Sequence, residues 1–192
     1  MRKAFFFAGC FLWLTLAAVD PVWSRNTADI VDLKVFADPP TLKISFRIDN
    51  CFNEDMEQAI QSGVATTFRI RVRVEKDGLP WLRERLVDAS VERTIRYDTL
   101  HEQYLVSRAD EPTSWLSTKD WEEAKIWMSE IRDFPVMALW RLASDQTYLV
   151  QVKAELSKAQ VPNFLRYIFV FVSLWDFETP WVTAYYTHSP TR

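Results

Sequence analysis

The two carboxylates whose spacing best suits catalysis are Asp176 and Glu178. Because they are two residues apart, they would lie on one face of an extended strand. Two carboxyl groups that face a bond across a cleft can hydrolyse a glycoside. In the structural interpretation, which we favour, the pair instead anchors backbone groups or arginines at the end of the core. A carboxylate-dependent hydrolase that uses these two residues is the alternative.

Other catalytic and cofactor-binding patterns are missing from the sequence. His101 and His188 are its two histidines, and neither has the neighbouring cysteines or carboxylates that a metal site requires. Three glycines in 192 residues argue against Gly-rich nucleotide-binding loops. Cys51 lies beside acidic residues, which oppose the formation of a thiolate. We therefore expect no catalytic residue, no metal and no cofactor.

Three arginines alternate along one predicted strand, residues 67–75, and therefore project from the same face. If residues 86–97 pair with that strand, Asp88 and Glu92 share this face. Cross-strand pairing of opposite charges is then the simplest interpretation. The alternative is a basic stripe that binds a phosphate-bearing envelope component or an acidic partner. That stripe would comprise Arg69, Arg71, Arg73, Arg93 and Arg96.

Aromatic residues are dense near the C-terminus, at Trp175, Phe177, Trp181, Tyr185 and Tyr186. We favour packing in the core as their role. An exposed aromatic group would instead mark a surface that contacts a partner or a membrane. The candidate binding residues are therefore the five arginines together with Trp175, Asp176 and Trp181.

Strands must position most of these residues, because apolar and polar side chains alternate with a period of two. The alternating segments are residues 31–35, 41–49, 67–75, 86–97, 102–108, 148–156 and 181–186. Arg93 breaks the rule, since it falls among the apolar residues of its strand. Either a bulge rotates Arg93 outward, or its stem lies along the core while its head reaches solvent.

Two helices are predicted between the strands. The first begins after Asn53, a good N-cap, and ends at Gly63, which suits a left-handed cap. Its stripe of Phe52, Met56 and Ile60 would cover an open end of the core. The second spans residues 119–132, with Ser117 and Asp120 as a capping box, and ends at Phe134 and Pro135. Residues 164–175 are apolar on every side, and their periodicity does not decide between a buried helix and a central strand.

The predicted fold is mainly β: an antiparallel, two-sheet, sandwich-like domain with two or three peripheral helices. Residues 28–187 form one domain in this interpretation. Residues 1–24 have the features of a signal peptide, a positive start followed by an apolar run, with cleavage after Ser24 or after Ala18. A retained leader would instead tether the domain to the inner membrane.

The net charge limits the classes of partner that we expect, and the number of cysteines limits how the fold can be stabilised. The chain has a net charge of -3, and the leader carries more basic than acidic residues, so the mature protein is acidic. An acidic domain is not expected to bind nucleic acid. Cys51 would be the one cysteine left after cleavage, so stability must come from the apolar core rather than from a disulfide.

Four segments in this order resemble a bacterial family called domain of unknown function 4390 (DUF4390). They are residues 50–74, residues 93–106, residues 121–156 and residues 175–181. The resemblance covers about residues 28–187. Cys51 stands where the family more often has a small residue, which weakens any shared role for the thiol. The resemblance implies an exported envelope protein of Gram-negative bacteria, without an established activity, and some members are thought to be encoded near membrane sensor kinases.

The sequence thus predicts a periplasmic protein that acts as a non-catalytic binding or accessory module. Its expected partner is an envelope protein, with a membrane sensor kinase as the partner that the resemblance suggests and anionic lipid as another. The alternative function is an envelope hydrolase centred on Asp176 and Glu178. The oligomeric state is left open.

Overall fold

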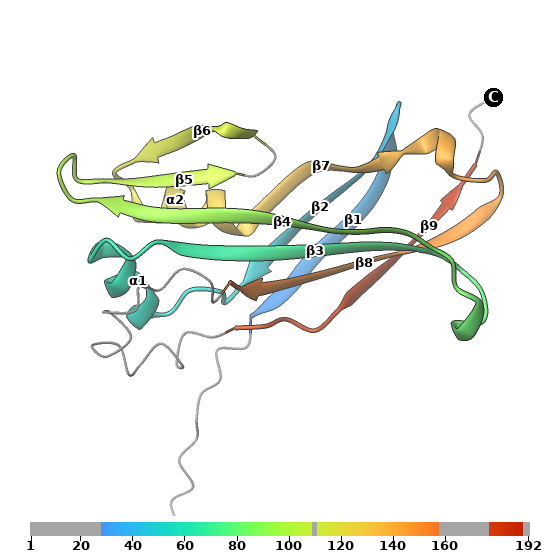
Figure 1. Cartoon of the computed structure of the whole chain (residues 1–192), viewed down its shortest axis with the longest axis horizontal. Helices are drawn as coiled ribbons and strands as arrows, with labels where there is room; N and C mark the ends of the chain where they lie inside the picture. The colour runs from blue at the N-terminus through green and yellow to red at the C-terminus, as the bar shows by residue number, and fades with distance from the viewer. Residues whose placement is uncertain (1–27, 109–110, 158–176, 190–192) are drawn as a thin grey trace, which may run out of the picture.

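The computed structural model describes residues 28–108, 111–157 and 177–189, which form two antiparallel sheets (Figure 1). One sheet contains, in spatial order, β1 (Asp29–Asp38), β2 (Thr41–Asp49) and β7 (Glu130–Ala138). The other contains β6 (Glu111–Thr118), β5 (Gln103–Arg108), β4 (Arg85–Asp98), β3 (Thr66–Lys76), β8 (Gln146–Leu156) and β9 (Val182–His188). The prediction of a mainly β, sandwich-like fold is confirmed.

The core lies between the sheets and follows from the two-residue period of their strands. β2 and β3 bury every second side chain: Leu42, Ile44, Phe46, Ile48, Phe68, Ile70, Val72 and Val74. β8 contributes Val150, Val152 and Ala154 in the same way. Apart from the buried Thr67 and Leu149, most alternate residues of these strands are polar and at least partly exposed, so each sheet has one apolar face and one wet face.

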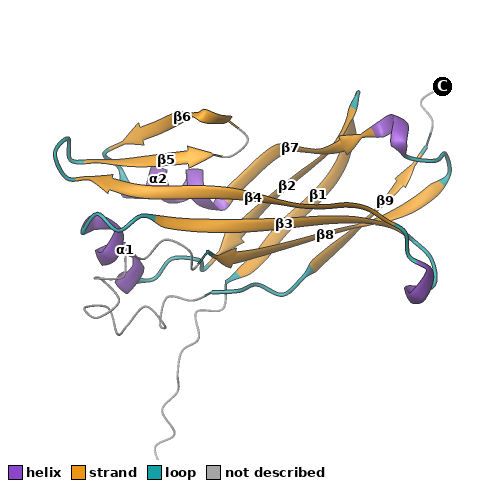
Figure 2. Ribbon diagram, viewed as in Figure 1, coloured by secondary structure: helices purple, strands orange, loops and turns teal. Residues whose placement is uncertain are grey.

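The two sides of the sandwich differ. Along one side β1 runs against β9 and β8, so the sheets close on each other there (Figure 2). On the other side β7 lies over β4, and helix α2 (Trp121–Ser129) packs on β4, β5 and β6 beyond it. Helix α1 (Glu54–Gln61) connects the sheets between β2 and β3 at one end of the molecule.

Helix α1 has the caps that its sequence predicts. The Asn53 side-chain oxygen accepts a hydrogen bond from the Met56 amide at 2.8 Å. Gly63 has a φ of +88°, and the amides of Gly63 and Val64 donate to the carbonyls of Ile60 and Ala59. This pair of bonds closes the helix in a Schellman motif, for which glycine is favoured at the left-handed position.

The prediction for α2 is wrong at both ends. The helix stops at Ser129 rather than at residue 132, and β7 begins at Glu130 and runs through Phe134 and Pro135. β7 pairs with β2, whose second edge would otherwise stay open, so tertiary pairing overrides the local helical pattern. At the other end Asp120 caps the helix through the Glu122 amide, and Thr118 rather than Ser117 supports it, by accepting from the Asp120 amide and donating to Glu123.

The structure does not describe residues 1–24 or 164–175, so the predicted signal peptide and the helix-or-strand alternative lie outside it. No helix in the described ranges is both long enough and apolar enough to cross a membrane. Two short 3-10 helices complete the fold. They are η1 (Pro80–Leu82), in the connection from β3 to β4, and η2 (Leu139–Arg141), directly after β7.

Candidate functional site

The arginine row lies on the wet face of β3, as predicted, and two of its members pair across strands. Arg69 Nη2 lies 2.9 Å from Glu92 Oε1, and Arg73 Nε lies 3.4 Å from Asp88 Oδ2. Both carboxylates stand directly opposite their arginines in the register of β3 and β4. Cross-strand charge pairing is therefore confirmed for Arg69 and Arg73, and acidic groups interrupt the basic stripe.

Arg71 differs from its two neighbours in the row. It stands opposite Ser90 on β4 and Lys153 on β8, and no carboxylate of the described residues lies within ion-pair distance of it. The guanidinium carbons of Arg73 and Arg71 lie 4.2 and 5.8 Å from the centroid of the Trp181 ring. Lys153 faces the same ring at 5.8 Å. Trp181 thus serves as a cation–π platform for this part of the sheet.

Arg93 does not join the stripe, so both of its predicted placements are wrong. Its residue is only 4 % exposed, and Nη1 donates to the carbonyl of Trp127 at 2.7 Å and to that of Glu130. These carbonyls belong to the C-terminal end of α2, where backbone acceptors lack intrahelical donors and a positive charge is favoured. Arg93 therefore caps the helix from the sheet and ties α2 to β4.

Arg96 is exposed on the outer face of β4, but it lies apart from the arginine row. Its guanidinium carbon lies 4.9 Å from the centroid of the Trp115 ring on β6. The candidate arginines thus belong to three different environments: a charge-paired row, a buried cap and an isolated stack on Trp115. They do not form a single basic surface.

The residues proposed for hydrolysis are described only in part. Trp175 and Asp176 lie outside the described residues. Glu178 forms an ion pair with Lys153, and its side chain is 63 % exposed. An exposed, ion-paired carboxylate is a common feature of protein surfaces. The geometry around Glu178 therefore agrees with the anchoring role.

The C-terminal aromatic residues divide between core and surface. Phe177 is 1 % exposed and packs edge-to-face on Phe68, with 4.8 Å between the ring centroids. Core packing is confirmed for Phe177, while Trp181 and Tyr186 are partly buried. Tyr185, on the outer face of β9, is 67 % exposed. Because Tyr185 and Tyr186 are adjacent in the strand, their side chains lie on opposite faces of the sheet.

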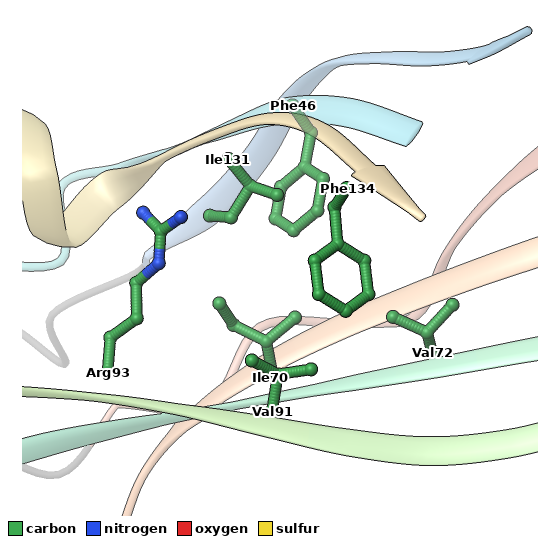
Figure 3. Close-up of a pocket in the computed structure, with 7 residues that line it drawn as sticks. All are labelled: Phe46, Ile70, Val72, Val91, Arg93, Ile131 and Phe134. Carbon is green, nitrogen blue, oxygen red and sulfur yellow. The ribbon is translucent and has the colours of Figure 1, made fainter. Parts of the chain in front are cut away.

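A small apolar hollow opens between β4 and β7 (Figure 3). Its volume is about 10 Å³, which is room for roughly one water molecule and far less than a ligand pocket occupies. The lining residues are Phe46, Ile70, Val72, Val91, Arg93, Ile131 and Phe134. The hollow marks the place where the two sheets separate rather than a small-molecule site.

The reactive side chains of the described residues have structural roles. Cys51 is buried, its Sγ donates to the Ile48 carbonyl at 3.3 Å, and burial raises the pKa of the thiol to about 12. His101 Nδ1 lies 2.9 Å from Asp98 Oδ2 in the turn after β4, and this hydrogen bond lowers the pKa of Asp98. No group of three or more His, Cys, Asp or Glu residues in the described ranges is placed to hold a metal ion.

One surface was missed by the sequence analysis. Four large apolar side chains are exposed on and beside η1 and η2: Leu79 (54 %), Trp81 (78 %), Leu82 (71 %) and Trp140 (82 %). Arg141 Nη2 donates to the Leu86 carbonyl at 3.3 Å, which joins η2 to the start of β4 directly after η1. We call these four residues the apolar end. Its signal in the sequence was a run of apolar residues at 79–82, between the predicted strands 67–75 and 86–97.

Comparison with known proteins identifies the family. A family model described as "Domain of unknown function (DUF4390)" matches residues 25–184. Comparisons with curated proteins and with solved structures gave no significant match. The family match covers most of the chain and includes both sheets, both helices and the apolar end. The chain therefore belongs to the DUF4390 family.

Proposed function

We propose that this protein is a non-catalytic binding module of the bacterial envelope, which docks on a partner protein through its apolar end. The observation that carries the proposal is the exposure of Trp81 and Trp140, which lie on two short helices at opposite corners of the same end of the molecule (Figure 2). Exposed groups of large apolar side chains mark interaction surfaces, and tryptophan is enriched among the residues that dominate binding energy.

The position of these side chains also supports a binding role. η1 and η2 lie at the same end of the molecule, away from α1 and away from the turn between β4 and β5 (Figure 2). Arg83 and Arg141 flank the exposed tryptophans in sequence, and arginine is a common companion of aromatic residues in interfaces. Backbone hydrogen bonds from Leu82 to Leu79 and from Leu142 to Leu139 close the two helical turns that present the tryptophans.

We further propose that the module works in the periplasm after removal of the leader, and that its partner is an envelope protein such as a membrane sensor kinase. The apolar start of the sequence and the lone Cys51 of the mature chain support the location. N-terminal sequencing of the protein from its own cells tests it. A mature start after Ser24 or Ala18 is expected, whereas an intact leader would mean a membrane tether.

Site-specific photo-crosslinking in living cells tests the binding surface. A photoreactive phenylalanine replaces Trp81 in one variant and Leu100 in the control. Leu100 is 84 % exposed in the turn at the opposite end of β4, so it matches the 78 % exposed Trp81 in exposure. We expect a discrete protein adduct from position 81, identified by mass spectrometry, and none from position 100. The same adducts from both positions, or none from either, would contradict the proposal.

A further inference from the structure

Strand β4 is longer than the strand beside it. β3 pairs with β4 from Arg85 to Ile95, but β5 pairs with it only from Arg93 to Asp98. Residues 85–92 therefore have β3 on one side and no described strand on the other (Figure 1). Arg141 already bonds the Leu86 carbonyl, so we define the open edge as residues 87–92. Its outward backbone groups are available for hydrogen bonding.

The two edges of the three-stranded sheet carry features that block pairing. β7 contains Pro135 and has two register shifts against β2. β1 has a bulge between Val31 and Lys34, with Asp32 at a φ of 56°. Proteins use such bulges and prolines to keep foreign strands off their edges. The open edge contains no proline, and its register against β3 runs without a shift, so it is suited to accept a strand.

The inner face of the open edge is apolar. Val87, Ala89 and Val91 stand opposite the buried Val74, Val72 and Ile70, so they lie on the inner face of their sheet. Val91 and Phe134 line the hollow between the sheets. Ala89 is exposed although it shares the face of the buried Val72 opposite, so the space beside it is not filled. Every second side chain of an added strand would cover this apolar surface.

The outer face of the open edge carries two carboxylates, which pair with arginines of β3 on one side and, for Asp88, with Arg85 of β4. The side chains of Asp88 and Glu92 are 35 and 45 % exposed, with Ser90 between them. Directly opposed charges of opposite sign stabilise neighbouring strands, and like charges destabilise them. Lysine or arginine on the added strand would therefore fit. A second copy of this chain paired antiparallel about Ser90 would bring Asp88 against Glu92, which disfavours self-pairing.

We propose that the open edge binds an extended segment of a partner protein by strand addition, and that apolar residues alternate with lysine or arginine in this segment. Main-chain hydrogen bonds would supply affinity, and the two faces of the edge would supply specificity. The proposal rests on the role as a binding module, but it uses a surface other than the apolar end.

Peptide binding by the full chain tests the charge preference. The probe is a fluorescent octapeptide of alternating lysine and valine, and its control replaces each lysine with glutamate. We expect the lysine peptide to bind at least about tenfold more tightly, because Asp88 and Glu92 are the charged outer-face residues of the strand that the peptide would neighbour, and lysine opposes their charge whereas glutamate repeats it. Equal affinities, or no binding of the lysine peptide, would overturn the proposal.

Backbone methylation tests the mode of binding. In one lysine–valine peptide the valine nitrogens are methylated, and in the other the lysine nitrogens are. Alternate residues of a strand direct their N–H groups to opposite sides, so only one of the two sets can donate to β4. One peptide should lose at least about tenfold in affinity while the other binds nearly as the parent does. Equal losses would exclude strand addition.

Two adjacent substitutions locate the peptide on the protein. Ala89→Asp places a charge on the apolar inner face, whereas Ser90→Asp places the same charge on the outer face, opposite Arg71. A89D should weaken peptide binding at least about tenfold, and S90D should retain or strengthen it. Wild-type affinity in A89D would refute the site.

A third variant, Trp81→Ser, separates this proposal from the proposed function. It should leave peptide affinity unchanged, since it alters only the apolar end. A loss of peptide binding in W81S that matches the loss in A89D would place the peptide at the apolar end and refute the open edge as its site. The crosslinking test at position 81 can fail without affecting any of these titrations.

Discussion

Arg93 offers the sharpest test of how this fold is held together. Its guanidinium donates to two carbonyls at the end of α2 while its residue is only 4 % exposed. Arg93→Met keeps an apolar stem of similar length but removes both hydrogen bonds. The Trp127 and Glu130 carbonyls would then lose a charged donor in a place that water barely reaches. We therefore expect a large loss of stability and a loosened α2.

The magnitude follows from the two bonds. A hydrogen bond to a charged group contributes about 1.5–3 kcal/mol, so R93M should lower the free energy of unfolding by about 3–6 kcal/mol. Arg93→Lys keeps the charge but lacks the planar guanidinium that reaches both carbonyls. It should therefore lower the free energy of unfolding by about half as much as R93M does. Arg96→Met is the control on the same strand. It removes an exposed stacking contact with Trp115 and should cost about 1 kcal/mol or less.

Urea-induced unfolding at neutral pH measures these changes, followed by far-ultraviolet circular dichroism and tryptophan fluorescence. Similar slopes against urea are required if the free energies are to be compared. The order of stability should be wild type, R96M, R93K and then R93M. An R93M protein that is as stable as R96M would refute the assignment of Arg93 as the cap that joins α2 to the sheet.

Two further predictions concern the core. Phe177→Ala should lower the free energy of unfolding by about 3–5 kcal/mol in the same assay, because it leaves a cavity beside Phe68; a cost below about 1 kcal/mol would contradict the packing. The raised pKa of Cys51, about 12 in the fold against 9.0 for an ordinary thiol, predicts that alkaline pH destabilises the wild type relative to Cys51→Ala. Below about pH 9 the thiol keeps its proton in the folded and in the unfolded protein, and above that pH only the unfolded protein releases it. The difference in the free energy of unfolding between C51A and the wild type should therefore grow by about 1.4 kcal/mol between pH 8 and pH 10. A difference that is independent of pH would show that the thiol titrates normally.

Local sequence patterns predicted an element correctly where its tertiary contacts favour the same secondary structure. β2 occupies residues 41–49 as its alternation predicts, and Asn53 and Gly63 cap α1. The local pattern was misleading for residues 130–138. Its helical stripe continues through Ile131, but this segment pairs with the free edge of β2 and becomes a strand. β6 was missed altogether. Local propensity is weak compared with the hydrogen bonds and burial that a neighbouring strand supplies.

The residues of the candidate site were likewise predictable from the sequence only in part. The alternation of Arg69, Arg71 and Arg73 placed them together on one face, and their cross-strand acids were foreseeable from the same period. Arg93 was recognisable as an exception in its strand, but its partners on α2 lie 34 and 37 residues away in sequence. The open edge could not be derived from the sequence, since it depends on where β5 stops along β4. The apolar run at residues 79–82 was visible, but only the structure shows that its side chains are exposed.

The sequence by itself determined that the chain makes two wet-faced sheets around an apolar core, because a period of two assigns each side chain to a face regardless of what lies beyond it. Only the tertiary structure decided which sheet each strand joins, where β5 stops along β4, and what meets Arg93 inside the fold. Those features arise from contacts between residues far apart in the chain, and such contacts leave no period in the sequence that encodes them.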